Sequence, residues 1–122
     1  MSSTHAELVH RLIDAINDTD PVGRRATIQE IFTPDCAYTD PDDAVEGHDA
    51  LDALFARLQS QAPPGFRFDL AAPVNAHHQQ ARFAWKYGPL DRPTPVATGS
   101  DVMTFRDGRI HRVYAFFDDR SA

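Results

Sequence analysis

Two aspartates in this sequence stand where a carboxyl group could take part in proton transfer. Asp101 shares side-chain parity with Met103 and Phe105 on an expected strand, so all three point to one face. Burial among apolar groups disfavours the charged form of a carboxyl and raises its pKa. A protonated Asp101 could then donate a hydrogen bond to a ligand oxygen. The alternative is a structural role, with Asp101 bonded to a neighbouring arginine or backbone N–H.

Asp40 is the second candidate. It ends a short expected strand, where it shares parity with Tyr38, and Pro41 follows it directly. In that position it could face a cavity and act as a general base. An Asp-Pro pair is also an ordinary turn signal, and the neighbouring Asp42-Asp43 fits a solvated acidic loop. Both interpretations of Asp40 stay open at this stage.

Aromatic side chains are expected around these carboxyls. Phe83, Trp85 and Tyr87 share one face of their strand, and Phe117 faces the same concave side as Val113 and Ala115. A half-buried tryptophan also needs a partner for its N–H. The residues expected to line a binding site are Tyr38, Phe55, Phe83, Trp85, Tyr87, Met103 and Phe117.

Several other functions are disfavoured. His77-His78 is the most tempting metal pair, but adjacent residues on a strand point to opposite faces, so we predict no metal. The chain has neither a Gly-rich phosphate loop nor a Gly-x-Ser-x-Gly elbow, and we predict no cofactor. A net charge of −6 with scattered arginines argues against nucleic acid. The absence of a secretory leader or membrane span, together with a single cysteine, favours the cytoplasm.

The first half of the chain reads as helical. Thr4 and Glu7 have capping-box spacing before an apolar stripe that runs from Leu8 to Ile16. Asp20-Pro21 begins a second short helix that is expected to stop at Thr33-Pro34. Residues 36–40 form a short strand candidate. A third helix follows Gly47, and Pro63-Pro64-Gly65 ends it.

The second half reads as strands over residues 66–74, 79–87, 95–106 and 109–118. Asp107-Gly108 joins the last two and is the strongest hairpin signal in the chain. Consecutive strands pair mostly antiparallel, and 122 residues leave room for one domain. We therefore expect a single α+β domain, with three N-terminal helices packed on a curved, mainly antiparallel mixed sheet that encloses a pocket.

The outer face of that sheet should carry an apolar patch. Val102, Thr104, Tyr114 and Phe116 point away from the helices by parity. Exposed apolar patches usually mark interfaces, so we expect a homodimer formed sheet to sheet.

The chain resembles the SnoaL-like branch of the nuclear transport factor 2 superfamily from about Leu8 to Asp118. The segments that carry the resemblance are residues 31–41 (IFTPDCAYTDP), 46–51 (EGHDAL), 82–85 (RFAW) and 99–110 (GSDVMTFRDGRI). The resemblance implies a cone-shaped α+β fold. Its bearing on the reaction is weaker, because the superfamily includes isomerases, cyclases, dehydratases, epoxide hydrolases and proteins without known catalysis.

Ketosteroid isomerase is the informative comparison within the superfamily. The resemblance places Asp40 at that family's catalytic base and Asp101 at its protonated oxyanion-hole aspartate. The family's tyrosine on the first helix has no counterpart, since the chain offers only His10, Arg11 or Leu12 there. The epoxide hydrolase pattern of an arginine between two aspartates is also missing, because Ala84 follows Arg82 two residues on.

We therefore carry three hypotheses. The first is a cofactor-independent acid–base enzyme of isomerase, cyclase or dehydratase type, acting on a small apolar carbonyl or hydroxyl compound through Asp40 and Asp101. The second is a non-catalytic, ligand-binding homodimer of the same fold. The third is a structural dimer whose own side chains fill the pocket. Only the first requires the two aspartates to converge.

Overall fold

A computed structural model describes residues 4–92 and 94–118. The first two helices begin at the residues that the sequence indicated. Helix α1 spans His5–Asn17, and the Thr4 hydroxyl caps it by accepting from the Glu7 N–H at 3.1 Å. Helix α2 spans Pro21–Ile31, and the Asp20 carboxylate accepts from two N–H groups of its first turn.

Helix α3 spans Gly47–Gln61 and follows a change in backbone direction. Gly47 has φ +85°, a conformation that side-chain-bearing residues seldom adopt. The buried guanidinium of Arg24 in α2 binds the Asp52 carboxylate of α3 at 2.9 Å, which ties these two helices together.

The strands form one mixed, mostly antiparallel sheet in the order β2-β1-β7-β6-β5-β3, with β4 paired to β5. Only β1 and β7 pair in parallel among the described strands. Their bounds are β1 Phe32–Thr39, β2 Ala44–Glu46, β3 Phe66–Leu70, β4 Asn75–His77, β5 Gln80–Pro89, β6 Ala97–Arg106 and β7 Arg109–Phe117.

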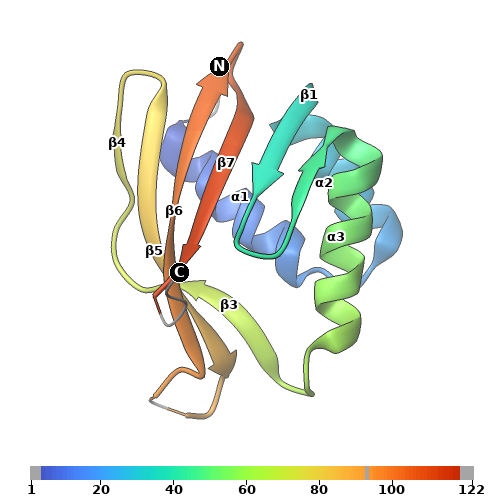
Figure 1. The fold of residues 1–122 in the computed structure, drawn as a ribbon, viewed down its shortest axis with the longest axis vertical. Helices are drawn as coiled ribbons and strands as arrows, with labels where there is room; N and C mark the ends of the chain where they lie inside the picture. Colours follow the sequence, from blue (N-terminus) through green and yellow to red (C-terminus); the bar gives the residue numbers. More distant parts are fainter. Residues whose placement is uncertain (1–3, 93, 119–122) are drawn as a thin grey trace.

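The sheet curves around the helices, as Figure 1 shows, with α1 passing behind β5, β6 and β7 and α3 beside the β1–β2 hairpin. The apolar residues of all three helices meet the concave face of the sheet. Phe32, Phe55, Met103, Ile110 and Val113 are buried there almost completely. This arrangement is the expected α+β fold of three helices on a curved mixed sheet.

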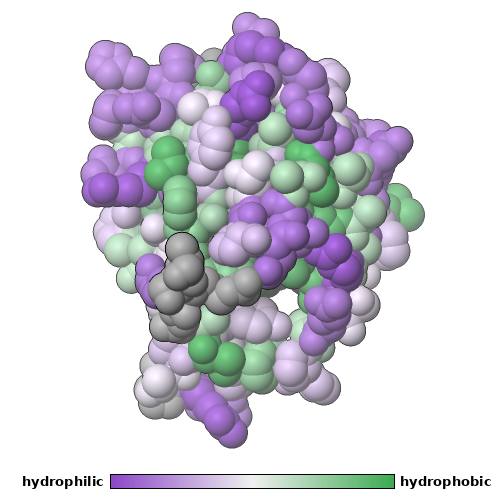
Figure 2. Space-filling model, in the orientation of Figure 1, coloured by the Kyte–Doolittle hydropathy of each residue, from purple (hydrophilic) through white to green (hydrophobic). Residues whose placement is uncertain are grey.

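The side-chain register of the long strands also agrees with the sequence. Asp101, Met103 and Phe105 are buried along β6, whereas Val102 and Thr104 between them are only half-buried. In β7, Val113 and Ala115 are buried, while Tyr114 and Phe116 keep 39% and 58% of their surface exposed. Hydrophobic residues accordingly interrupt the hydrophilic surface on the face shown in Figure 2.

Several short elements differ from the sequence expectation. Residues 66–74 are not one strand: β3 ends at Leu70 and β4 begins at Asn75. Pro73 lies in the gap, and a proline has no N–H to contribute to a ladder. Strand β2 was not predicted. Strand β1 starts at Phe32, directly after α2, so the second helix ends at Ile31 rather than at Thr33-Pro34.

The His77-His78 pair also lies differently. His77 ends β4, and His78 sits in the turn to β5 with φ +53°. Within the described part of the chain, no three His, Cys, Asp or Glu side chains are grouped so that they could hold a metal ion. No helix among the described residues is long and apolar enough to cross a membrane.

Candidate active-site cavity

A cavity opens between helices α1 and α3 and the concave face of the sheet. Its space, including the part open to solvent, is about 530 Å³. Figure 2 shows an opening in the surface between the β1–β2 turn and β3. The lining consists of Leu12, Ile13, Ile16, Tyr38, Asp40, Phe55, Leu58, Phe68, Phe83, Trp85, Asp101, Ala115 and Phe117.

Asp101 projects from the middle of β6 into this cavity and is only 8% exposed. Its Oδ1 accepts a hydrogen bond from the indole Nε1 of Trp85 at 2.8 Å. Burial raises the pKa of Asp101 to about 7, the Asp40 charge adds to the rise, and the Trp85 hydrogen bond opposes it. Near neutral pH this carboxyl can therefore hold or release a proton.

Gly99 explains how Trp85 reaches Asp101. Trp85 is the direct cross-strand partner of Gly99, two residues before Asp101 on β6. A Cβ atom on Gly99 would lie 2.2 Å from the indole ring and 2.2 Å from the backbone oxygen of Phe116. Only glycine leaves the room in which the indole can lie across β6 and direct its N–H to Asp101.

Asp40 lies at the end of β1 and is half-buried at the cavity wall. The hydroxyl of Tyr38 donates to Oδ2 of Asp40 at 2.9 Å. The N–H groups of Asp42 and Asp43 donate to its Oδ1 at 2.8 and 2.7 Å. Asp40 thus both lines the cavity and closes the turn to β2, so the two interpretations of this residue from the sequence are compatible.

The two aspartates therefore line one cavity, in different surroundings. Asp101 has an indole donor and apolar neighbours, whereas Asp40 has three donors at the rim of a turn. The charges of both aspartates act on Tyr38. Burial and these charges raise the pKa of the Tyr38 phenol, which keeps it protonated and able to donate.

Most of the expected lining residues lie at the cavity, and two do not. Tyr38, Phe55, Phe83, Trp85 and Phe117 line it. Met103 is fully buried in the core, because two residues along a strand carry it about 7 Å beyond Asp101. Tyr87 lies beyond Trp85 by the same step.

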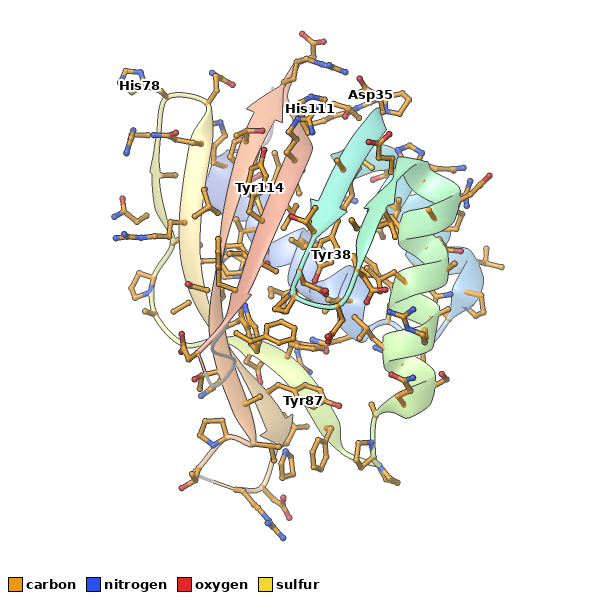
Figure 3. The ribbon with its side chains drawn as sticks, viewed as in Figure 1. Asp35, Tyr38, His78, Tyr87, His111 and Tyr114 are labelled. Carbon is orange, nitrogen blue, oxygen red and sulfur yellow. The ribbon has the colours of Figure 1, made fainter. Side chains whose placement is uncertain are left out.

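Tyr87 instead lines an adjoining hollow with Leu58, Gln61 and Ala97, and Phe68, Trp85 and Phe117 border both spaces. Figure 3 shows Tyr87 well separated from Tyr38.

The sequence expectation missed part of the wall. Leu12, Ile13 and Ile16 of α1 face the cavity as well as the core, and Phe68 of β3 completes the aromatic lining. The apolar stripe of α1 predicted that these residues are buried, but it could not indicate which turn of the helix lines the cavity. The hydrogen bond from Tyr38 to Asp40 had no sequence signal beyond shared parity.

The first helix supplies no polar group to the described cavity lining. Leu12 lines it, whereas Arg11 points to solvent and binds Glu30 of α2 at 2.5 Å. His10 is exposed. Tyr38 of β1 is instead the phenol of this cavity, and its partner is Asp40 rather than Asp101.

Known proteins resemble this chain in both sequence and fold. The sequence profile of the SnoaL-like domain matches residues 9–113. The chain belongs to the SnoaL-like family. A crystal structure of a candidate isomerase of that family from Agrobacterium tumefaciens is 30% identical, with a TM-score of 0.86, and the match covers 93% of this chain and 97% of that one.

More distant structures share the fold. A candidate polyketide cyclase from Sinorhizobium meliloti is 20% identical with a TM-score of 0.70, covering 89% of this chain and 93% of that one. A protein with a ketosteroid isomerase-like fold from Catenulispora acidiphila, solved in complex with trimethylamine, is 17% identical with a TM-score of 0.73, covering 92% and 85%. A search of curated proteins finds no significant match.

Proposed function

We propose that this SnoaL-like protein is a cofactor-independent acid–base enzyme that acts on a small apolar carbonyl or hydroxyl compound. One observation carries the proposal: Asp40 and Asp101 line the same apolar cavity and have unequal surroundings. Acid–base chemistry needs one group that accepts a proton and another that donates one. Two carboxyls whose environments separate their proton affinities supply that pair.

The shared step would be removal of a proton from a carbon next to a carbonyl group. The C–H electron pair moves into a carbon–carbon double bond, the carbonyl electrons move to oxygen, and the proton passes to Asp40. Protonated Asp101 donates a hydrogen bond to the oxygen as negative charge develops there. The aromatic wall lowers the polarity of the surroundings, which strengthens that hydrogen bond.

Isomerases, cyclases and some dehydratases differ in the fate of the enolate that this step forms. Return of the proton to another carbon completes an isomerisation, and attack of the enolate on a second carbonyl closes a ring. In a dehydration the enolate re-forms its carbonyl, a carbon–carbon double bond forms as the next C–O bond breaks, and the hydroxyl takes the proton from Asp40 and leaves as water. The similar proteins from Agrobacterium and Sinorhizobium, described as a candidate isomerase and a candidate polyketide cyclase, belong to two of these classes.

The second candidate function is ligand binding without turnover. Asp40 already accepts three hydrogen bonds, and a carboxylate gives up part of that bonding when it takes a proton. These three hydrogen bonds favour a role for Asp40 as a fixed negative charge that binds a ligand, rather than as a base that takes up a proton. The Catenulispora protein, which holds trimethylamine, illustrates small-molecule binding within this fold.

Proton exchange separates the two functions. Small cyclic ketones and enones are first screened for thermal stabilisation of the protein, and those that bind are incubated with it in D2O. Nuclear magnetic resonance then measures how fast deuterium enters the position next to the carbonyl. Exchange above the buffer rate supports the enzyme. Binding with exchange only at the buffer rate overturns catalysis of this step and leaves the binding function.

A further inference from the structure

The charges around the cavity are all of one sign. Of the side chains that line it, only Asp40 and Asp101 can carry a charge at neutral pH. The lining includes no lysine, arginine or histidine in the part of the chain that the structure describes. Helices α1 and α3 face the cavity only with apolar residues. An ionised Asp101 therefore has no cationic side chain beside it among these lining residues.

One oxygen of Asp101 is unused. Oδ1 accepts from Trp85, but Oδ2 has no hydrogen-bond partner among residues 4–92 and 94–118. The residue is more than nine-tenths buried and borders the cavity. No described side-chain nitrogen or oxygen atom is both buried and without a hydrogen-bond partner, so Oδ2 is accessible from the cavity space. A ligand that donates there would bond an oxygen that no described protein group occupies.

The walls beside Asp101 are aromatic. Phe68 and Phe117 each meet the Trp85 ring edge-on, with ring centres 5.6 and 5.5 Å apart and interplanar angles of 72° and 89°. All three rings border the cavity. Aromatic faces attract cations, tryptophan most strongly, and the attraction grows when water is excluded.

We propose that the cavity also binds a small hydrophobic organic ammonium ion, whose N–H donates to the free oxygen of Asp101 while its carbon groups pack on the Trp85, Phe68 and Phe117 rings. Asp40, at the cavity wall with its Tyr38 partner, adds a second negative charge that favours the cation. The proposal uses the cavity of the proposed function but does not depend on turnover there.

The protonation of Asp101 decides which ligand is favoured. The titratable groups that act on Asp101 are Tyr38 in β1 and Asp40, which follows the end of that strand. With its pKa raised to about 7, Asp101 is a donor to neutral oxygen ligands at lower pH and a bare carboxylate at higher pH. Ammonium binding should therefore strengthen as pH rises, whereas binding of a neutral acceptor should not.

Trp85 provides the readout, because it is the chain's single tryptophan and lies in the cavity wall. Its fluorescence is titrated with benzylammonium and with benzyl alcohol, which have nearly the same shape but differ in charge. With the pKa of Asp101 raised to about 7, its carboxyl becomes mostly ionised between pH 6 and pH 8.5, and we expect benzylammonium to bind about tenfold more tightly at the higher pH. Benzyl alcohol carries no charge, and its hydroxyl can accept from the protonated carboxyl or donate to the ionised one, so its binding should show no comparable gain at the higher pH.

Two variants complete the test. Asp101→Asn keeps an oxygen for the Trp85 N–H but removes the charge, so it should abolish the pH dependence of benzylammonium binding. Asp91→Asn removes the same unit of charge from an exposed turn and should behave as wild type. If Asp101→Asn is unstable, the pH dependence of the wild type still decides.

The outcomes separate the two proposals. Benzyl alcohol binding without benzylammonium binding would overturn the ammonium site while leaving the proposed acid–base function standing. Benzylammonium binding that is independent of pH, or that is unchanged in Asp101→Asn, would also overturn the ammonium site. Failure of both ligands to bind at either pH would overturn the ammonium site, and the proton-exchange assay would judge the proposed function separately.

Discussion

The indole N–H of Trp85 lies 2.8 Å from Oδ1 of Asp101, and this hydrogen bond joins the only two polar groups that β5 and β6 direct into the described cavity. It fixes one oxygen of the carboxyl and leaves the other facing the open space. The bond favours the charged form of Asp101, whereas burial favours the neutral form, and burial is the larger effect. This balance sets the protonation of Asp101, and with it the stability and chemistry of the cavity.

Asp101 should make the protein less stable as pH rises. Its pKa is raised from the ordinary value of 3.8 to about 7, so between those values the folded protein holds a proton that the unfolded chain releases. Stability should fall through this window, by about 4 kcal/mol at about 1.4 kcal/mol for each pKa unit. Asp101→Asn has no carboxyl to hold this proton. In chemical denaturation from pH 4 to 8, the free energy of unfolding of the wild type should therefore fall relative to that of the variant.

The surface variant Asp91→Asn is the matched control for that series, because it removes an exposed carboxylate. Its denaturation profile should run parallel to that of the wild type. If the Asp101→Asn profile were parallel as well, Asp101 would titrate at an ordinary pH, and its burial would carry no chemical consequence.

Gly99→Ala should destabilise the protein by about 1–3 kcal/mol, the usual cost of overpacking. The new methyl group would lie against both the Trp85 ring and the Phe116 carbonyl, so at least one must move. Denaturant unfolding measures the loss, and a shift in Trp85 fluorescence reports the displaced indole.

Ser100→Ala, one residue along on the half-buried outer side of β6, is the control for this change. This substitution adds no atoms, and the free energy of unfolding of the variant should stay within about 0.5 kcal/mol of the wild-type value. Equal stability of Gly99→Ala and Ser100→Ala would show that the indole does not depend on the space at Gly99.

Much of the fold could be predicted because its signals are local. The Thr4 and Asp20 caps, the helix after Gly47 and the Asp107-Gly108 hairpin each depend on a few neighbouring residues, and all are present. The strands β2 and β4 were missed because each has only three residues. Such strands form when a longer partner, β1 or β5, offers a free edge, and that is a tertiary effect.

The site was less predictable than the fold. Strand parity placed Asp101 and Trp85 on one face, but it could not show that the indole crosses Gly99 to reach the carboxyl. Parity also grouped Tyr87 and Met103 with the lining, because it reports the face of a strand and not the position along it. Where the cavity ends along β5 and β6 depends on how α1 and α3 sit on the sheet.

We predict a homodimer through the outer face of the sheet. Tyr114 and Phe116 are exposed there beside half-buried Val102, and an apolar face of this kind usually marks an interface. Phe116→Glu should convert the protein to a monomer in light scattering. Val22→Glu changes an even more exposed apolar residue on α2 and should leave the mass unchanged. A monomeric wild type at all concentrations would contradict the prediction.

Asp101 should act on a carbonyl ligand by donating a hydrogen bond. Asp101→Asn retains a donor of similar shape, whereas Asp101→Leu retains none. The Asn variant should therefore lose less proton-exchange activity than the Leu variant, with both compared at saturating ketone. Equal losses would mean that hydrogen-bond donation is not the contribution of Asp101.

Proton exchange by Asp40→Asn tests the proposed acid–base function most directly. Asn keeps the oxygen that accepts from the Asp42 and Asp43 N–H groups, so the turn should be preserved while the carboxylate is lost. With a ketone that the wild type exchanges in D2O, we expect the rate to fall by about 10²–10⁴-fold, with nearly unchanged ketone binding by Trp85 fluorescence. Exchange by Asp40→Asn at the wild-type rate would contradict the assignment of Asp40 as the base.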